Sequence, residues 1–351
     1  NIRIYTMKFQ NKNSKSSFFK KIFIKICRLL KFEIIDQGKL YLPVADKYIS
    51  EELSTIGKMS LVIPMGITNI TRPVKSLDII LRTCSSVNML SQSKKRLFEK
   101  DKSQYTLRTL NSIIKSINNS KEIFKRINLK ITIIDHNSQI EIIDQMKFLL
   151  KEQFFSSEII NLKIDNFEKQ IEKVNQQNKK VTDNQISNMS NIHQSLLIAK
   201  DCEDLIYFVE DDYIHTISSI KEMLLTYERL SSQLKEEIIL CPTDYPYLYN
   251  KLEKSKIFLG NKYHWRQIEE SLCTFLTSSL MVKKYWKNFT SACKIEHYPF
   301  EKPFHEIYKK EFCLSPIPSL AIHCTNINSV YGLSPFIDYK KLWEENEIKD
   351  A

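Results

Sequence analysis

The feature that most constrains the fold is a set of three short, β-rich apolar runs, each of which ends abruptly in polar residues. Stretches with helical periodicity, residues 105–117 and 188–200, lie between them. Alternating strands and helices are typical of βαβ units and a mostly parallel sheet. We therefore predict an α/β fold with a Rossmann-like central sheet flanked by helices. The runs and their polar tails are LDIIL (77–81) before Arg82-Thr83-Cys84-Ser85, LKITII (129–134) before Asp135-His136-Asn137-Ser138, and LIYFV (205–209) before Glu210-Asp211-Asp212.

The acidic triplet of residues 210–212 is the strongest candidate site. In an open parallel sheet, ligands bind at the carboxyl ends of the strands, so the three polar tails should line one crevice. Mg²⁺ and Mn²⁺ take oxygen ligands, usually one or two carboxylates together with phosphate oxygens and water. We expect Asp212, furthest into the loop, to bind the metal, and Glu210 and Asp211 to hold a ribose or a metal-bound water. The alternative is a solvated turn or a helix N-terminus, where carboxylates are also favoured.

The order of these elements resembles the GT-A fold, and especially the glycosyltransferases of family 2. Residues 78–83 resemble the first strand of that family, residues 133–138 its "VVDDGS" strand end, and residues 208–212 its DXD motif. The resemblance covers roughly residues 77–325. It implies transfer of a hexosyl or N-acetylhexosaminyl group from a nucleotide-sugar to a glycan, a lipid-linked acceptor or another hydroxyl, as in surface polysaccharide or glycoconjugate synthesis.

The resemblance also assigns residues to the nucleotide. It implies that Arg82 and Thr83 lie near the nucleotide, that Asp135 bonds its base or ribose, and that Asn191, also a nucleotide-binding candidate, occupies a polar position in the helix before the metal strand. His136 departs from the family, which often has a second acid there, and residues 86–104 form a long insertion.

Two further assignments concern the C-terminal third of the sequence. Residues 318–323 (PSLAIH) look like a segment of some GT-A enzymes in which the histidine approaches the metal or the diphosphate, so His323 is a second metal candidate. Its alternative is a structural histidine.

An inverting enzyme of this kind uses a carboxylate base. Pro303 starts a helix in which Glu306 lies in the first turn. Glu306 is therefore the first candidate for the base, with Glu301 and Glu270 behind it, and Asp211 is a second catalytic candidate. The alternative is that Glu306 only complements the helix dipole.

A segment dense in aromatic and polar side chains suits a sugar pocket, because sugars present apolar faces as well as hydroxyls. Asp244, Tyr245, Trp265 and Arg266 are the candidate substrate-binding residues. Ordinary packing of Tyr and Trp in the core is the equal alternative.

The N-terminal residues 17–32 interleave lysine and arginine with apolar residues at helical spacing, which predicts a basic amphipathic helix. Either it packs on the catalytic domain or it docks on an anionic membrane surface. We expect three parts: residues 1–59 with the helix and a connector, residues 60–340 as the GT-A domain, and residues 341–351 as a charged tail.

Composition restricts the remaining alternatives. The formal charge is +11, but no recognisable nucleic-acid-binding motif accompanies it. The eight cysteines are scattered singly, without the spacing of metal ligands, and no apolar run is long enough to span a bilayer. We expect a cytoplasmic protein without a nucleic-acid partner, with peripheral contact to the inner membrane face as the alternative to a fully dissolved one. The five glycines, at 38, 57, 66, 260 and 332, exclude P-loop and dinucleotide-binding motifs and disfavour a nucleotidyltransferase. A non-catalytic relative of the fold that binds a glycan or a nucleotide is the other alternative.

Overall fold

The computed structural model describes residues 18–32, 54–62, 66–86, 96–250, 254–325 and 327–348. Of the predicted connector and insertion, residues 33–53 and 87–95 lie outside this description.

A nine-stranded mixed sheet forms the centre of the molecule, in the order β5-β4-β3-β6-β11-β8-β12-β10-β9. β5, β4, β3 and β6 run parallel, as β8 and β12 do, whereas β11, β10 and β9 pair antiparallel with their neighbours. The predicted α/β class is confirmed, with the parallel character concentrated in one half of the sheet. The bounds are β3 Ser76–Thr83, β4 Asn128–Asp135, β5 Ser156–Asn161, β6 Leu205–Glu210, β8 Ile239–Leu240, β9 Ile257–Leu259, β10 His264–Gln267, β11 Phe275–Ser278 and β12 Cys313–Ile317.

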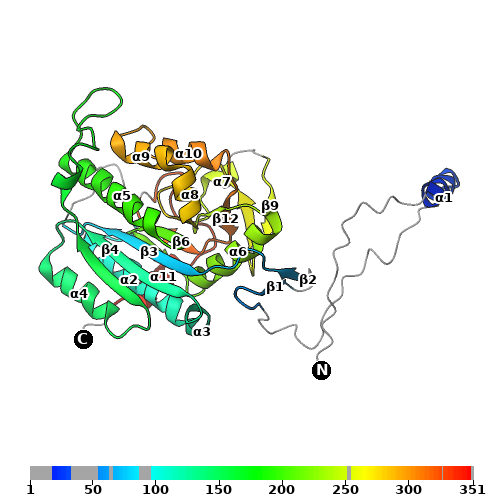
Figure 1. Ribbon diagram of the computed structural model, residues 1–351, viewed down its shortest axis with the longest axis horizontal. Coiled ribbons are helices and arrows are strands. Elements are labelled where there is room, and N and C mark those ends of the chain that lie inside the picture. The colour runs from blue at the N-terminus through cyan, green and yellow to red at the C-terminus, as the bar shows by residue number, and fades with distance from the viewer. Residues whose placement is uncertain are drawn as a thin grey trace.

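Helices cover both faces of the sheet (Figure 1), so β3, β4 and β6 are buried on both sides and read as continuous apolar runs, whereas the edge strand β5 is largely exposed. Leu77, Ile79 and Leu81 of β3 pack in one hydrophobic cluster, and Ile80 packs in the other. The first face carries α2 Lys102–Asn118, α3 Lys121–Phe124, α4 Ile140–Leu150 and α6 Ser219–Leu234. The second carries α5 Asp183–Asp201, α8 Ser279–Lys284, α9 Trp286–Lys294 and α10 Lys302–Tyr308.

A two-stranded sheet beyond the end of β6 connects two distant parts of the sequence. β7 (Tyr213–His215) follows the acidic triplet directly and pairs antiparallel with β13 (Ala321–His323), so that residue 213 faces residue 323. The backbone N–H of Cys324 also donates to the carbonyl oxygen of Asp212, at 2.9 Å. These pairings place the C-terminal segment against the triplet. Two short helical elements, η3 Ile164–Phe167 and α7 Tyr247–Asn250, lie in the connections between the strands.

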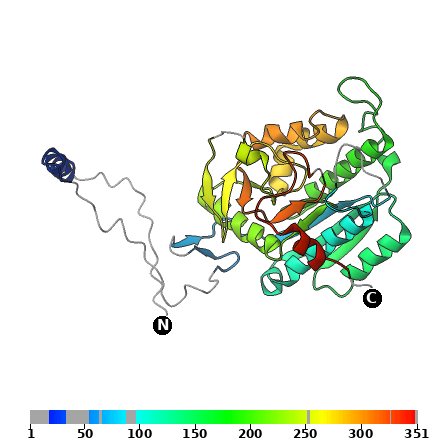
Figure 2. The same ribbon diagram turned by 180° about the vertical axis from the view of Figure 1, so that it is seen from behind.

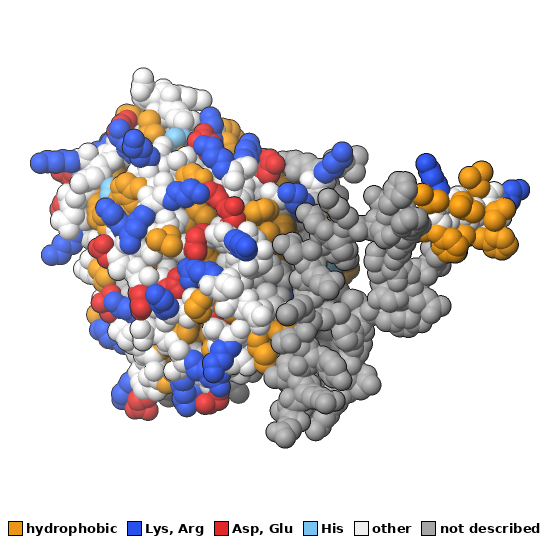
Figure 3. All heavy atoms as spheres, turned by 45° about the vertical axis from the view of Figure 1, so that its right-hand side comes forward, with side chains coloured by type: hydrophobic (Ala, Val, Ile, Leu, Met, Phe, Trp, Pro, Cys, Tyr) orange, Lys and Arg blue, Asp and Glu red, His pale blue; other side chains and the backbone are white. Residues whose placement is uncertain are grey.

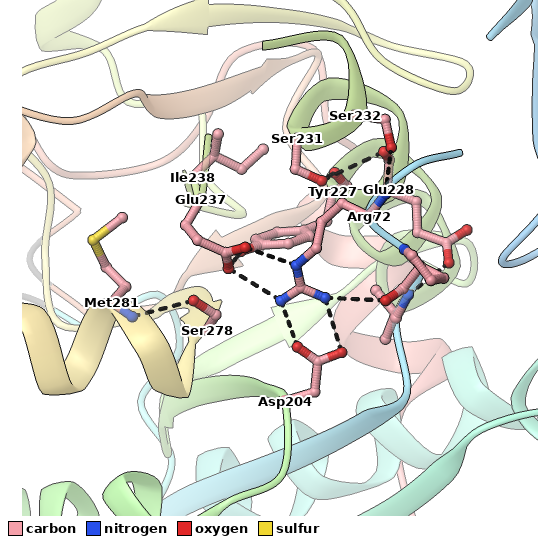
Figure 4. Close-up of polar contacts among 12 residues, drawn as sticks. Arg72, Asp204, Tyr227, Glu228, Ser231, Ser232, Glu237, Ile238, Ser278 and Met281 are labelled. Atoms are coloured by element: carbon pink, nitrogen blue, oxygen red, sulfur yellow. Dashed lines mark hydrogen bonds and ion pairs between the residues drawn. The ribbon is translucent and has the colours of Figure 1, made fainter. Parts of the chain in front are cut away.

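The segment before β3 is fastened to α6 and to the start of β6 by a half-buried charge cluster (Figure 4). The Arg72 guanidinium lies 2.5 Å from Asp204 and 2.7 Å from Glu237, whose second oxygen accepts from the Tyr227 hydroxyl at 2.6 Å. Glu228 accepts from the backbone N–H of Val74 at 2.8 Å. The hairpin that precedes the cluster consists of β1 Met59–Val62 and β2 Gly66–Asn69, so the boundary expected at residue 59 falls inside β1.

The last described helix, α11 (Tyr339–Glu345), packs on α2 (Figure 2). Trp343 is buried, and the Arg108 guanidinium lies 4.3 Å from the centre of its ring. The domain boundary expected at residue 340 therefore falls inside α11, which packs on one of the helices that cover the sheet.

Helix α1 (Phe18–Leu29) confirms the predicted amphipathic helix. Four of its described hydrophobic side chains are exposed, Ile22, Phe23 at 59%, Ile26 and Leu29 at 82%, and Figure 3 shows hydrophobic side chains gathered on the helix surface. None of the described helices combines the length and the apolar character that crossing a bilayer requires.

Candidate functional site

The three polar strand tails meet at one edge of the sheet, as the sequence predicts. The register sets Thr83 opposite Asp135 across β3 and β4, and Arg82 opposite Glu210 across β3 and β6. The Thr83 hydroxyl donates to Oδ1 of Asp135 at 2.6 Å. The candidate site is therefore assembled at the carboxyl ends of parallel strands.

Asp135 is engaged on both oxygens by its own loop. Ser138 donates its hydroxyl to Oδ1 at 2.6 Å and its backbone N–H to Oδ2 at 3.1 Å. Asn191 of α5 donates from Nδ2 to the carbonyl oxygen of Ile134 at 2.9 Å, and its Oδ1 is buried without a hydrogen-bond partner. Asp135 therefore orders the end of β4, and the Asn191 Oδ1 is a buried acceptor beside it.

Each carboxylate of the acidic triplet lies beside a different basic side chain. The pairs come from three separate elements, which means that the triplet is a junction of the fold and not a solvated turn. The distances are 3.0 Å from Arg82 Nη2 to Glu210 Oε1, 3.1 Å from Lys102 Nζ to Asp211 Oδ1, and 3.3 Å from His323 Nε2 to Asp212 Oδ2.

Asp211 is held from every side and is buried. Its Oδ2 accepts from the backbone N–H of Cys84 at 3.2 Å and from the Thr106 hydroxyl at 2.9 Å. Burial alone would lower the pKa of Lys102, but Asp211 and Asp212 raise it above the ordinary value. Sequence reasoning missed both Lys102, at the end of the insertion, and Thr106, just after it, because only the packing of α2 brings them to the triplet.

Asp212 and His323 form the second buried pair. His323 donates from Nδ1 to the carbonyl oxygen of Tyr331 at 3.1 Å, which turns Nε2 toward Asp212. The Thr325 hydroxyl donates to the same Asp212 oxygen at 2.6 Å. Burial alone would raise the pKa of Asp212, but His323 and Thr325 hold it below its usual range; in turn Asp212 outweighs burial and raises the pKa of His323.

The residues of this pair fit a divalent cation that brings most of its own ligands. Among the described residues, no group of three or more His, Cys, Asp or Glu side chains is arranged to hold a metal. Asp212 and His323 nevertheless offer an oxygen and an imidazole nitrogen within 3.3 Å of each other. Two protein ligands suit Mn²⁺ or Mg²⁺ when a diphosphate and water complete the coordination.

Of the predicted sugar-binding residues, Tyr245 contacts the site, but its side chain is buried, so it supports the site from behind and presents no face to a sugar. Its hydroxyl lies 2.6 Å from that of Tyr213, next to the triplet. Asp244 and Arg266 form a buried ion pair with each other, and Trp265 is 0% exposed in the hydrophobic core. The indole of Trp265 thus packs against the core and presents no face to a sugar, so the core-packing alternative holds for this residue.

The candidate bases lie in different places. Glu306 is exposed on α10, accepts from Asn288 at 3.3 Å and lines a surface cavity of about 330 Å³ between α9 and α10 that contains none of the strand-end residues. Glu270 accepts from the Tyr331 hydroxyl at 3.2 Å, and the carbonyl of the same tyrosine is the partner of His323. Burial and the charge of Glu270, and further that of Glu301, raise the pKa of Tyr331. The contacts therefore connect Glu270, and not Glu306, to the triplet.

Comparison with known proteins finds similarity in structure alone. No protein-family profile and no curated protein matches the chain. Among solved structures, S. aureus TarS has a TM-score of 0.31 and 11% identity over 60% of this chain, which spans 30% of TarS. The galactosyltransferase LgtC in complex with donor and acceptor sugar analogs has a TM-score of 0.32 and 9% sequence identity; the match covers 66% of this chain and 65% of LgtC. UDP-glucose pyrophosphorylase complexed with UDP-glucose has a TM-score of 0.36 and 8% sequence identity; the match covers 78% of this chain and 97% of that protein. The similar structures thus include a galactosyltransferase and a UDP-glucose pyrophosphorylase.

Proposed function

We propose that this protein is a metal-assisted glycosyltransferase of the GT-A type, which moves a sugar from a nucleotide-sugar to a hydroxyl acceptor. The observation that carries the proposal is the position of Glu210-Asp211-Asp212 at the carboxyl end of β6, against the end of β3 and against His323. That edge of a parallel sheet is where such folds bind nucleotides.

In this proposal, Asp212 and His323 hold Mn²⁺ or Mg²⁺. The bound cation would neutralise the diphosphate as it leaves. Thr83 and Asp135 form the floor of the nucleotide site, where their mutual hydrogen bond keeps the ends of β3 and β4 together. Arg82 fixes Glu210, which leaves that half-exposed carboxylate positioned toward a ribose or a metal-bound water.

The acceptor hydroxyl needs a carboxylate that takes its proton. The sequence favours Glu306 for this role, whereas the contacts favour Glu270. Tyr331 joins Glu270 to the Asp212–His323 pair, and its ring packs 5.4 Å from Tyr245 and 5.1 Å from Tyr247. Tyr245 and Tyr247 are buried behind the half-buried Tyr331, so we assign the acceptor to the side of Tyr331 and Glu270, with Glu270 as the base.

Calorimetry with a panel of nucleoside diphosphates and Mn²⁺ tests the function. We expect one base to bind, and the matching nucleotide-sugars to be hydrolysed slowly without an acceptor, which also identifies a hexosyl or an N-acetylhexosaminyl donor. Binding of none would favour the non-catalytic alternative. Release of pyrophosphate from a nucleoside triphosphate and a sugar phosphate would instead indicate a nucleotidyltransferase, a reaction that the absence of a glycine between β3 and α2 disfavours.

We also propose a peripheral contact of α1 with an anionic membrane on the cytoplasmic side, where a lipid-linked or glycan acceptor would be met during polysaccharide synthesis. The exposed apolar side chains of α1 and the lysines and arginine interleaved with them are the features that such helices use.

A further inference from the structure

Lys102 occupies a position at the candidate site that the proposed function leaves without a task. It is the first residue of α2, its side chain is 27% exposed, and its ammonium lies 3.1 Å from the buried Asp211 carboxylate. Asp212 adds to the negative field around the same ammonium. The ammonium thus contacts Asp211 and lies in the field of Asp212, on a side chain that keeps part of its surface exposed.

Asp211 is committed to holding this lysine in place. Cys84 and Thr106 occupy one of its oxygens, and Lys102 occupies the other. A carboxylate so enclosed is a poor ligand for a metal that has to be exchanged. An ammonium has three N–H donors, and one directed at Asp211 leaves the others for an anion.

The start of α2 adds positive potential at the same place. Its N-cap residue, Asp101, makes no side-chain capping hydrogen bond, although its carbonyl oxygen accepts from the N–H of Gln104 at 3.0 Å. Helix N-termini attract phosphate, and a lysine in the first turn strengthens this attraction.

We propose that Lys102 binds an oxygen of the donor's diphosphate, with Asp211 as the residue that positions it. This inference rests on the proposed function, since it assigns a second cationic contact to the same nucleotide. Asp212 and His323 serve the metal, and Lys102 serves the diphosphate directly. Part of the diphosphate affinity should therefore survive when the metal is removed.

The competing explanation is that Lys102 is only the counter-ion of Asp211. Both explanations predict damage when the lysine is lost, because the buried Asp211 is then left with an unbalanced charge. They differ in whether the affinity is lost for the diphosphate alone or also for the nucleoside. They differ as well in whether the affinity recovers when Asp211 is neutralised together with the lysine.

Calorimetric titration of the full chain separates the two. The probes are the tightest-binding nucleoside diphosphate of the panel and its parent nucleoside, each with Mn²⁺ and in excess chelator. The variants are Lys102→Met, Lys102→Arg, the pair Lys102→Met/Asp211→Asn, and Lys100→Met as the matched control on an exposed lysine. Circular dichroism confirms that each variant is folded.

We expect Lys102→Met to weaken the diphosphate about tenfold to a hundredfold, the range for a charge-assisted hydrogen bond, and to leave the nucleoside unchanged. Lys102→Arg should retain part of the affinity, the paired variant should stay weak, and Lys100→Met should bind like the wild type. Equal losses for both probes, or recovery in the paired variant, would overturn the inference. Should the wild type bind no nucleoside diphosphate at all, the proposed function itself fails.

Discussion

The imidazole of His323 stacks on the ring of Tyr213, with 4.9 Å between the ring centroids and 20° between the planes. The contact spans the β7–β13 pairing, in which these two residues face each other. Because the stacking and the bond to the Tyr331 carbonyl fix the orientation of the imidazole, its Nε2 is aimed at Asp212. A strand pairing between distant segments therefore completes the candidate metal site.

The first prediction concerns this pair. Asp212→Asn should abolish sugar transfer and weaken Mn²⁺ binding in electron paramagnetic resonance titrations, because the variant loses the carboxylate that holds the cation. Asp201→Asn, an exposed change at the end of α5, is the control. Full turnover of the wild type in excess chelator would contradict the metal assignment.

The second prediction separates the candidate bases. Glu270→Gln keeps the shape and removes the proton acceptor, so turnover should fall about a hundredfold or more. The acidic limb of its pH profile should disappear, and donor affinity should be unchanged. Glu306→Gln should keep most of its turnover. The opposite ranking would restore Glu306, whereas a large loss only in Glu301→Gln would place the base at the N-cap of α10.

A third prediction follows from the charge cluster before β3. Burial alone would raise the pKa of Glu237, but its bonds to Arg72 and Tyr227 lower it below the ordinary 4.5. A carboxyl whose pKa is lowered by folding stabilises the protein above its unfolded pKa and loses that contribution as the pH falls. The free energy of unfolding in urea should decline below about pH 4.5, and this decline should be shallower in Glu237→Gln. Identical slopes would show that Glu237 titrates alike in both states.

The fourth prediction tests α1 as a membrane contact. Deleting residues 1–32, or the pair Phe23→Ser and Leu29→Ser, should lower flotation with anionic vesicles far more than turnover on a soluble acceptor. Salt should weaken the wild-type association, because lysine and arginine contribute to it. Phe336→Ser changes a side chain that is 94% exposed outside α1 and should float like the wild type. Unfolding on deletion of the helix would show instead that it belongs to the domain.

The parallel half of the fold could be predicted from the sequence because its signals are local. β3, β4 and β6 lie within two residues of the apolar runs that predict them, and the sheet register then brings their polar tails together. A continuous apolar run that ends in charged residues contains both the strand and its functional end.

The remainder of the site depends on contacts that no local pattern contains. Lys102 reaches Asp211 only because α2 packs over the sheet edge, and the end of an insertion carries no periodicity that would indicate this. Trp265 and Arg266 are adjacent in sequence and alternate along β10, one into the core and the other onto Asp244. Glu306 lies in the predicted helix but faces away from the strand ends, because helix rotation is set by its partners.

The one-to-one pairing of the acidic triplet limits how this corner of the molecule can change over generations. A substitution at Asp211, for example, removes a carboxylate and also strands the ammonium of Lys102, so its cost combines chemistry with folding. Substitutions at these positions should therefore occur in pairs during evolution. A relative that has lost one residue of an ion pair is expected to have lost or exchanged its partner, and a single change at any of these positions should be rarer than a matched double change.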